Sequence, residues 1–95
     1  MKYSVLVIDD DKLVNEFLME TLKRAGYSGD AALTGEDGLN KFRADQHDIV
    51  MTDLKMPGMD GISVLEQIKK HSSDTPVVIM TAYGTVETAV KAIQK

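Results

Sequence analysis

The stretch Val5-Leu6-Val7-Ile8 is a continuous apolar run, mostly β-branched, and Asp9, Asp10 and Asp11 follow it directly. A strand that is apolar on both faces is typical of a parallel sheet covered by helices on both sides. The beginning of the chain therefore predicts a buried strand with acidic residues at its carboxyl end.

A helix is expected after these acids, ending at Gly26, because glycine is favoured just beyond the last helical turn. Its apolar residues recur at helical spacing, so we expect all of them to face the sheet: Leu13, Val14, Phe17, Leu18 and Leu22. Thr34 and Asp60 are suited to begin a second and a third helix. The second turns Leu39 and Phe42 inward. The third does the same with Ile62, Val64, Leu65 and Ile68.

Further strands are expected at 28–33, 49–52 and 77–80, and Gly84-Thr85 opens a last helix. Strands and helices thus alternate, which predicts a doubly wound, parallel α/β sheet. If the strand order is 2-1-3-4, the first and third strands are neighbours at the point of reversal. In such sheets the ligand site lies beyond the carboxyl ends of the strands, where the strand order reverses.

The composition fits one globular domain over residues 1–95, since 43% of the residues are apolar and 27% are charged. No cysteine is present, which excludes thiolate catalysis and zinc–thiolate sites. The net charge of −4, without a lysine or arginine cluster, argues against direct nucleic-acid binding. The first apolar run is too short for a signal peptide or a membrane span, so we expect a cytoplasmic protein without membrane contact.

Polar side chains collect where the strands end. Asp9 and Asp10 follow the first strand, Asp53 ends the third, and Thr81 follows the fourth. Clustered carboxylates repel one another, and a hard divalent cation relieves that repulsion. An all-oxygen donor set favours Mg²⁺, with Mn²⁺ as the alternative, over Zn²⁺. A carboxylate beside such an ion can act as a nucleophile toward phosphorus, and a threonine hydroxyl can donate to a phosphoryl oxygen.

Simpler interpretations exist for the same residues. The three consecutive aspartates could merely cap the first helix, and Asp11 is expected to be only a charge at the helix N-terminus. Thr81 could be an ordinary strand-end residue. His47 and His71 lie in polar turn regions, and we expect both to be solvated and to bind neither phosphate nor metal.

Three stretches together resemble the receiver domains of two-component response regulators. They read Val7-Ile8-Asp9-Asp10-Asp11, Met51-Thr52-Asp53-Leu54-Lys55-Met56-Pro57-Gly58-Met59-Asp60-Gly61, and Ile79-Met80-Thr81-Ala82. They occur in the family's order, and the resemblance spans the whole chain. The fold that it implies is flavodoxin-like.

The resemblance implies a role for each acidic residue. Asp53 corresponds to the phospho-acceptor. Asp10 would be a direct Mg²⁺ ligand, together with Asp53 and the backbone carbonyl of Lys55, and Asp9 would orient water molecules on the metal.

The resemblance also implies partners. Thr81 would bind the phosphoryl group and report its arrival, and Ala82 would stay small so that the phosphate can approach. The phosphoryl donor would be a phosphohistidine on a sensor histidine kinase. The stretch from Met80 to Val90 is similar to receivers that precede sigma-54-activating output domains, so we expect such domains in the parent protein, with a role in transcription regulation.

The family also has a fifth strand, which ends in a lysine, and a fifth helix, and neither has a counterpart here. We therefore expect a receiver shortened after its fourth helix, whose fourth strand forms an open edge. A homodimer or a swapped oligomer through that edge would follow.

Two other functions compete. A phosphatase of the haloacid-dehalogenase type also uses an aspartate after a strand, but it requires a second acid two positions later, where this chain has Lys55. A pseudo-receiver, which binds partners without being phosphorylated, would not need Asp9, Asp10, Asp53 and Thr81 together. The phosphorylated switch is the interpretation that these residues favour; it would not turn over a free substrate.

Overall fold

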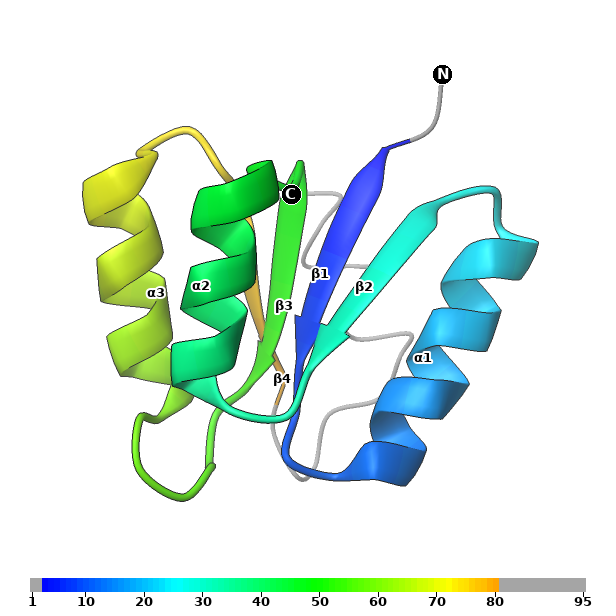
Figure 1. Ribbon diagram of the computed structural model, residues 1–95, viewed down its shortest axis with the longest axis horizontal. Helices are drawn as coiled ribbons and strands as arrows, with labels where there is room; N and C mark the ends of the chain where they lie inside the picture. The colour runs from blue at the N-terminus through cyan, green and yellow to red at the C-terminus, as the bar shows by residue number, and fades with distance from the viewer. Residues whose placement is uncertain (1–2, 81–95) are drawn as a thin grey trace.

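The structure is a computed structural model that describes residues 3–80. Strands and helices alternate through this part of the chain (Figure 1). In chain order they are β1 (Ser4–Ile8), α1 (Lys12–Arg24), β2 (Ser28–Ala32), α2 (Gly35–Asp45), β3 (Ile49–Asp53), α3 (Gly61–His71) and β4 (Val77–Met80). Thr81, Ala82 and the helix expected after Gly84 lie outside the described residues.

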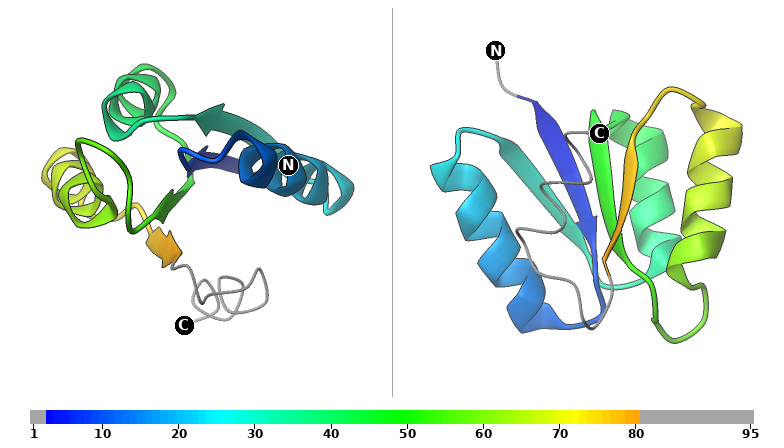
Figure 2. Two further views of the ribbon diagram at one scale, coloured as in Figure 1. Left: turned by 90° about the horizontal axis from the view of Figure 1, so that it is seen from below. Right: turned by 180° about the vertical axis from the view of Figure 1, so that it is seen from behind.

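The four described strands form one parallel sheet in the order β2-β1-β3-β4, as predicted. Helices α2 and α3 cover one face of this sheet, and α1 lies on the other (Figure 2). The strand order reverses between β1 and β3, so the carboxyl ends of these two neighbours form the point where a ligand is expected.

Each face of the sheet has its own apolar core, and β1 contributes to both. Leu6 and Ile8 pack with Phe42 of α2 on one side, while Val5 and Val7 pack on the other with a cluster that includes Leu18, Met51 and Val78. Because successive strand residues point to opposite faces, a strand buried on both sides has a nearly continuous apolar sequence. The two cores explain the uninterrupted run that begins the chain.

The helix ends follow the capping residues. Asp11, Thr34 and Asp60 cap the N-termini of α1, α2 and α3 by accepting hydrogen bonds from backbone N–H groups in the first turn. After α1, Gly26 adopts a φ of +91°, a conformation that favours glycine, and Tyr27 N–H donates to the Leu22 carbonyl at 2.9 Å. The predicted ends of these helices are confirmed.

The predicted inward faces of α1 and α3 are too wide. Leu13 and Phe17 are 75% and 60% exposed, and Ile62 of α3 is 43% exposed. The sheet touches only a narrow stripe of each helix, which in α1 centres on Leu18. An apolar residue at the margin of that stripe keeps its helical spacing but does not reach the core.

The expectation for His47 is wrong, whereas His71 is exposed as predicted. His47 is only 5% exposed. Its ring stacks on Phe42, with centroids 6.3 Å apart, and its Nε2 lies 3.1 Å from Oδ2 of Asp30. These partners lie on α2 and β2, and the local sequence around His47 does not reveal them. The hydrogen bond to Asp30 gives the buried Nε2 a polar partner in place of water.

Within residues 3–80, no helix has both the length and the apolar character that a bilayer crossing requires.

Candidate metal centre at the carboxyl ends of the strands

The register of the sheet brings three carboxylates together. Ile8 of β1 is paired with Thr52 of β3, so Asp9 and Asp53, the next residues along, lie beside each other. Asp9, Asp10 and Asp53 each offer a carboxylate oxygen, and these oxygens all lie within 4.8 Å of one another. The structure thus brings together the three acids that the sequence placed at one edge of the sheet.

The cluster carries uncompensated negative charge. Asp9 is buried, Asp53 is half-buried and Asp10 is exposed. Burial raises the pKa of Asp9 most strongly; the Asp11 N–H opposes that rise by donating to its Oδ1 at 2.9 Å, and the charges of Asp53, Asp10 and Asp11 add to it. Among the described residues, no lysine or arginine forms an ion pair with Asp9, Asp10 or Asp53.

These features fit a hard divalent cation. The donors are all oxygen atoms and no nitrogen or sulfur ligand joins them, which is the donor set that Mg²⁺ and Mn²⁺ accept. A doubly charged ion would also offset the repulsion from Asp53 and Asp10, which adds to the effect of burial on the pKa of Asp9.

The capping alternative applies to Asp11 alone. Its Oδ1 accepts from the backbone N–H of Leu13 at 2.9 Å and of Val14 at 3.4 Å. Neither Asp9 nor Asp10 caps α1, so helix capping does not account for these two acids.

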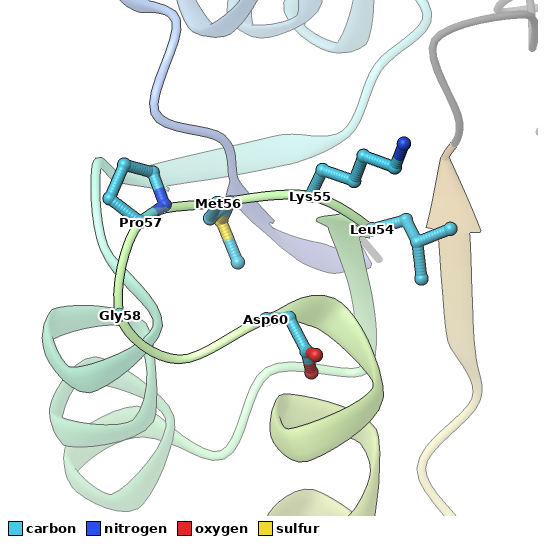
Figure 3. Close-up of a pocket in the computed structure, with 6 residues that line it drawn as sticks. All are labelled: Leu54, Lys55, Met56, Pro57, Gly58 and Asp60. Carbon is cyan, nitrogen blue, oxygen red and sulfur yellow. The ribbon is translucent and has the colours of Figure 1, made fainter.

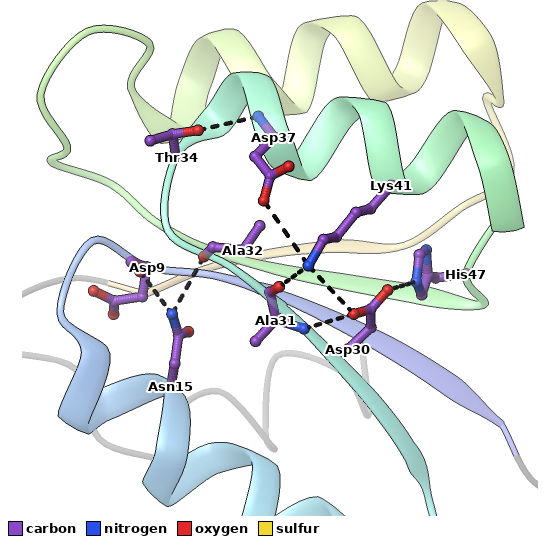
Figure 4. A network of polar contacts seen from close by, with 9 residues as sticks. All are labelled: Asp9, Asn15, Asp30, Ala31, Ala32, Thr34, Asp37, Lys41 and His47. Atoms are coloured by element: carbon purple, nitrogen blue, oxygen red, sulfur yellow. Dashed lines mark hydrogen bonds and ion pairs between the residues drawn. The ribbon is translucent and has the colours of Figure 1, made fainter.

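Asn15 supports the cluster and was missed in the sequence. This side chain is 4% exposed, and its Nδ2 donates to the carbonyl of Asp9 at 2.8 Å and to that of Ala32 at 3.2 Å (Figure 4). The Asp9 N–H donates to the same Ala32 carbonyl at 3.1 Å. Asn15 therefore ties α1 to the ends of β1 and β2 and fixes the backbone that carries Asp9. The sequence feature that could have revealed Asn15 is its position as a polar residue within the apolar stripe of the helix.

The loop after Asp53 folds back onto the strand end. The Gly61 N–H donates to the Leu54 carbonyl at 2.9 Å. A Cβ at Gly61 would collide with the carbonyl oxygen of Asp53 and lie 3.0 Å from the Cα of Leu54. Only glycine allows this approach, so the Asp60-Gly61 pair both caps α3 and positions the backbone of Asp53.

The same loop lines a pocket (Figure 3). Its lining residues are Leu54, Lys55, Met56, Pro57, Gly58 and Asp60. Lys55 stands two residues beyond Asp53 and is exposed; a metal-binding role for its carbonyl stays a prediction. On the other side of Asp53, Met80 of β4 is its register partner, and Thr81 is the next residue in the sequence.

The chain is similar to proteins of one family. The family described as "Response regulator receiver domain" matches residues 5–95. Regulatory protein AtoC of Escherichia coli is 38% identical over 90 residues, which are 95% of this chain and 20% of that protein. Transcriptional regulatory protein ZraR of Escherichia coli is 41% identical over 90 residues, again 95% of this chain and 20% of that protein. The chain thus spans about a fifth of the length of these relatives.

Solved structures agree with this assignment. A response regulator receiver domain from Clostridium thermocellum superposes with a TM-score of 0.82 at 31% identity, covering 97% of this chain and 75% of that one. The N-terminal domain of a response regulator receiver protein from Methanoculleus marisnigri has a TM-score of 0.81 at 36% identity, covering 94% of this chain and 75% of that one. The fold, the order of the strands and the family match all agree, and the chain belongs to the receiver-domain family of response regulators.

Proposed function

We propose that this receiver domain is a phosphorylation-controlled switch, in which Asp53 accepts a phosphoryl group with the help of Mg²⁺. The observation that carries the proposal is the convergence of Asp9, Asp10 and Asp53 at the strand-order reversal. An isolated aspartate at a strand end would have no means of neutralising an incoming phosphoryl group, whereas this cluster can hold a cation beside it.

Asp53 is suited to be the nucleophile. It is half-buried, and its carboxylate accepts no hydrogen bond from the residues that the structure describes. One carboxylate oxygen of Asp53 would form a bond to phosphorus while the bond between phosphorus and the phosphohistidine nitrogen of a sensor kinase breaks. The electron pair of that bond stays on the imidazole, which then takes up a proton.

Asp10, Asp53 and the carbonyl of Lys55 would hold the cation directly, and Asp9 would orient its water molecules. The ion, Mg²⁺ or alternatively Mn²⁺, would neutralise the negative charge of the phosphoryl oxygens. Asn15 would keep the backbone of Asp9 in place through its bond to the Asp9 carbonyl. The domain modifies itself in this way and does not turn over a free substrate.

Thr81 and Ala82 complete the proposal. Thr81 would donate its hydroxyl to a phosphoryl oxygen, and Ala82 would leave room for the phosphate. Movement of Thr81 toward the phosphoryl group would shift the face formed by β4 and the segment after it, and a partner would read that shift.

The parent protein would carry output domains beyond this receiver. AtoC and ZraR have four-fifths of their length outside the matched region. ZraR is a transcriptional regulatory protein, which supports a role of the parent protein in transcription regulation. We propose that its output domains are of the sigma-54-activating type. The receiver itself would act in the cytoplasm, and with its net charge of −4 it would not contact DNA.

Intact-protein mass spectrometry after incubation with acetyl phosphate tests the proposal. We expect one phosphoryl adduct per chain that requires Mg²⁺ and disappears in Asp53→Ala. A pseudo-receiver would give no adduct under any condition. A phosphatase of the haloacid-dehalogenase type would also use Asp53, but it would release many equivalents of phosphate per chain instead of accumulating the adduct.

A further inference from the structure

A second group of side chains that could hold a metal ion lies away from Asp53. Asp30 is in the middle of β2, Asp45 is the last residue of α2, and His47 precedes β3. Each offers one ligand atom, and these atoms all lie within 4.8 Å of one another. His47 lies before the start of β3, whereas Asp53 is its last residue, so the two groups lie at opposite ends of that strand.

The His47 ring is fixed with Nε2 directed into this group. The ring is 5% exposed and stacks on Phe42 at an interplanar angle of 22°. Nε2 lies 3.1 Å from Oδ2 of Asp30 (Figure 4), and Nδ1 has no hydrogen-bond partner among the described residues. The only polar partner of this buried ring in that part of the chain is therefore a member of the group itself.

The distance between these two atoms suits a metal ion. Metal–ligand bonds of about 2.0 to 2.2 Å place neighbouring ligand atoms roughly 2.8 to 3.1 Å apart at octahedral angles and roughly 3.3 to 3.6 Å apart at tetrahedral angles. Nε2 of His47 and Oδ2 of Asp30, 3.1 Å apart, already have the octahedral separation. An ion could replace the proton between them while both side chains stay in place, and rotation of the exposed Asp45 side chain would add the third ligand.

The local charge also favours a cation. Lys41 Nζ lies 3.7 Å from Oδ1 of Asp30 and 3.9 Å from Oδ2 of Asp37, and it donates to the Ala31 carbonyl. The Lys41 ammonium group thus pairs with two carboxylates. It contacts Oδ1 of Asp30, so Oδ2 of Asp30 is the atom that faces His47. Asp45 forms no ion pair with a lysine or arginine within residues 3–80, so the group keeps an excess of carboxylate charge.

We propose that Asp30, Asp45 and His47 bind a divalent transition-metal ion, for which Zn²⁺ is the probe. A set of one imidazole and two carboxylates favours Zn²⁺, Co²⁺ or Ni²⁺ over Mg²⁺, while the all-oxygen cluster at Asp53 has the opposite preference. The two sites would therefore select different ions by ligand chemistry. Because the site joins β2 to the α2–β3 connection, an ion bound there would stabilise the folded chain.

Isothermal titration of the 95-residue chain with Zn²⁺, in excess Mg²⁺ to occupy the other cluster, tests this site. We expect one Zn²⁺ per chain. The Zn²⁺ affinity should fall by at least about tenfold in Asp45→Asn and in His47→Gln, because replacing residues that only hydrogen-bond to metal ligands already lowers metal affinity by that factor. Asp45 is exposed, so its substitution preserves the fold even where that of the buried His47 does not.

Two matched controls identify the site. His71→Gln removes the other histidine, and Asp53→Asn weakens the all-oxygen cluster; neither is expected to change Zn²⁺ affinity. Co²⁺ binding, followed by visible absorption, should show the same pattern. Absence of Zn²⁺ binding, binding that Asp45→Asn leaves unchanged, or binding that Asp53→Asn abolishes would each overturn the proposal.

Discussion

Replacing Asp53 by asparagine (Asp53→Asn) is expected to stabilise the chain when no divalent cation is present. The substitution removes one negative charge from a cluster of three and keeps the size of the side chain. It breaks no side-chain hydrogen bond within residues 3–80, because the Asp53 carboxylate accepts none there. The change in the free energy of unfolding therefore reports charge repulsion.

The magnitude follows from the separation of the carboxylates. Two unit charges at the observed limit of 4.8 Å repel by roughly 0.9 kcal/mol in water and by roughly 1.7 kcal/mol at an effective dielectric constant of about 40. Asp53 has two such neighbours, but Asp10 is exposed and salt screens both pairs. We therefore expect a net gain of about 1 to 2 kcal/mol at low ionic strength.

Urea denaturation at neutral pH, with and without Mg²⁺, measures this gain. Mg²⁺ should stabilise the unsubstituted chain more than it stabilises Asp53→Asn, so the two stability curves should approach or cross as Mg²⁺ is added. Asp74→Asn, which removes an exposed carboxylate elsewhere, should change little. If Asp53→Asn lowers stability without the cation, or if Mg²⁺ stabilises both chains equally, the repulsion argument is wrong.

Three further predictions concern the surroundings of the cluster. Gly61→Ala should cost about 1 to 3 kcal/mol in a denaturation experiment, because the added Cβ meets the carbonyl of Asp53, and it should slow phosphorylation by acetyl phosphate. Asn15→Leu should cost about 1 to 3 kcal/mol, since two backbone carbonyls lose a buried donor, and should weaken Mg²⁺ affinity in a calorimetric titration. Because the pKa of Asp9 is raised above 3.8 in the folded chain, the folded chain binds more protons than the unfolded chain above that pH. In the absence of metal, the stability that Asp9 contributes should therefore fall as the pH rises from 3.8 through the raised pKa. Asp9→Asn should remove that part of the pH dependence, as measured by urea midpoints across the acidic range.

The sheet could be predicted because burial on both faces leaves a strong sequence signal. Every residue from Val5 to Ile8 is buried, and no polar residue interrupts that run. The alternation of strands and helices predicted a parallel sheet. The order 2-1-3-4 was a hypothesis consistent with the flavodoxin-like fold that the resemblance implies, and it placed Asp9 beside Asp53.

The roles of Asn15 and His47 could not be predicted in the same way. Both are buried polar residues whose partners lie elsewhere in the chain: Ala32 for Asn15, and Asp30 for His47. Helical spacing also could not show that Phe17 lies beyond the edge of the contact with the sheet. Such features depend on how elements meet in three dimensions, which periodicity alone does not encode.

The central claim is that Asp53 carries the phosphoryl group, and chemical mapping of that residue tests it most directly. Borohydride reduces an acyl phosphate to an alcohol, so the phosphorylated chain should yield homoserine at position 53 after reduction and peptide mass analysis. We predict this conversion at Asp53 only, and only when Mg²⁺ was present during phosphorylation. Conversion at Asp9 or Asp10 instead, or an unaltered Asp53 in a chain that has gained a phosphoryl group, would contradict the claim.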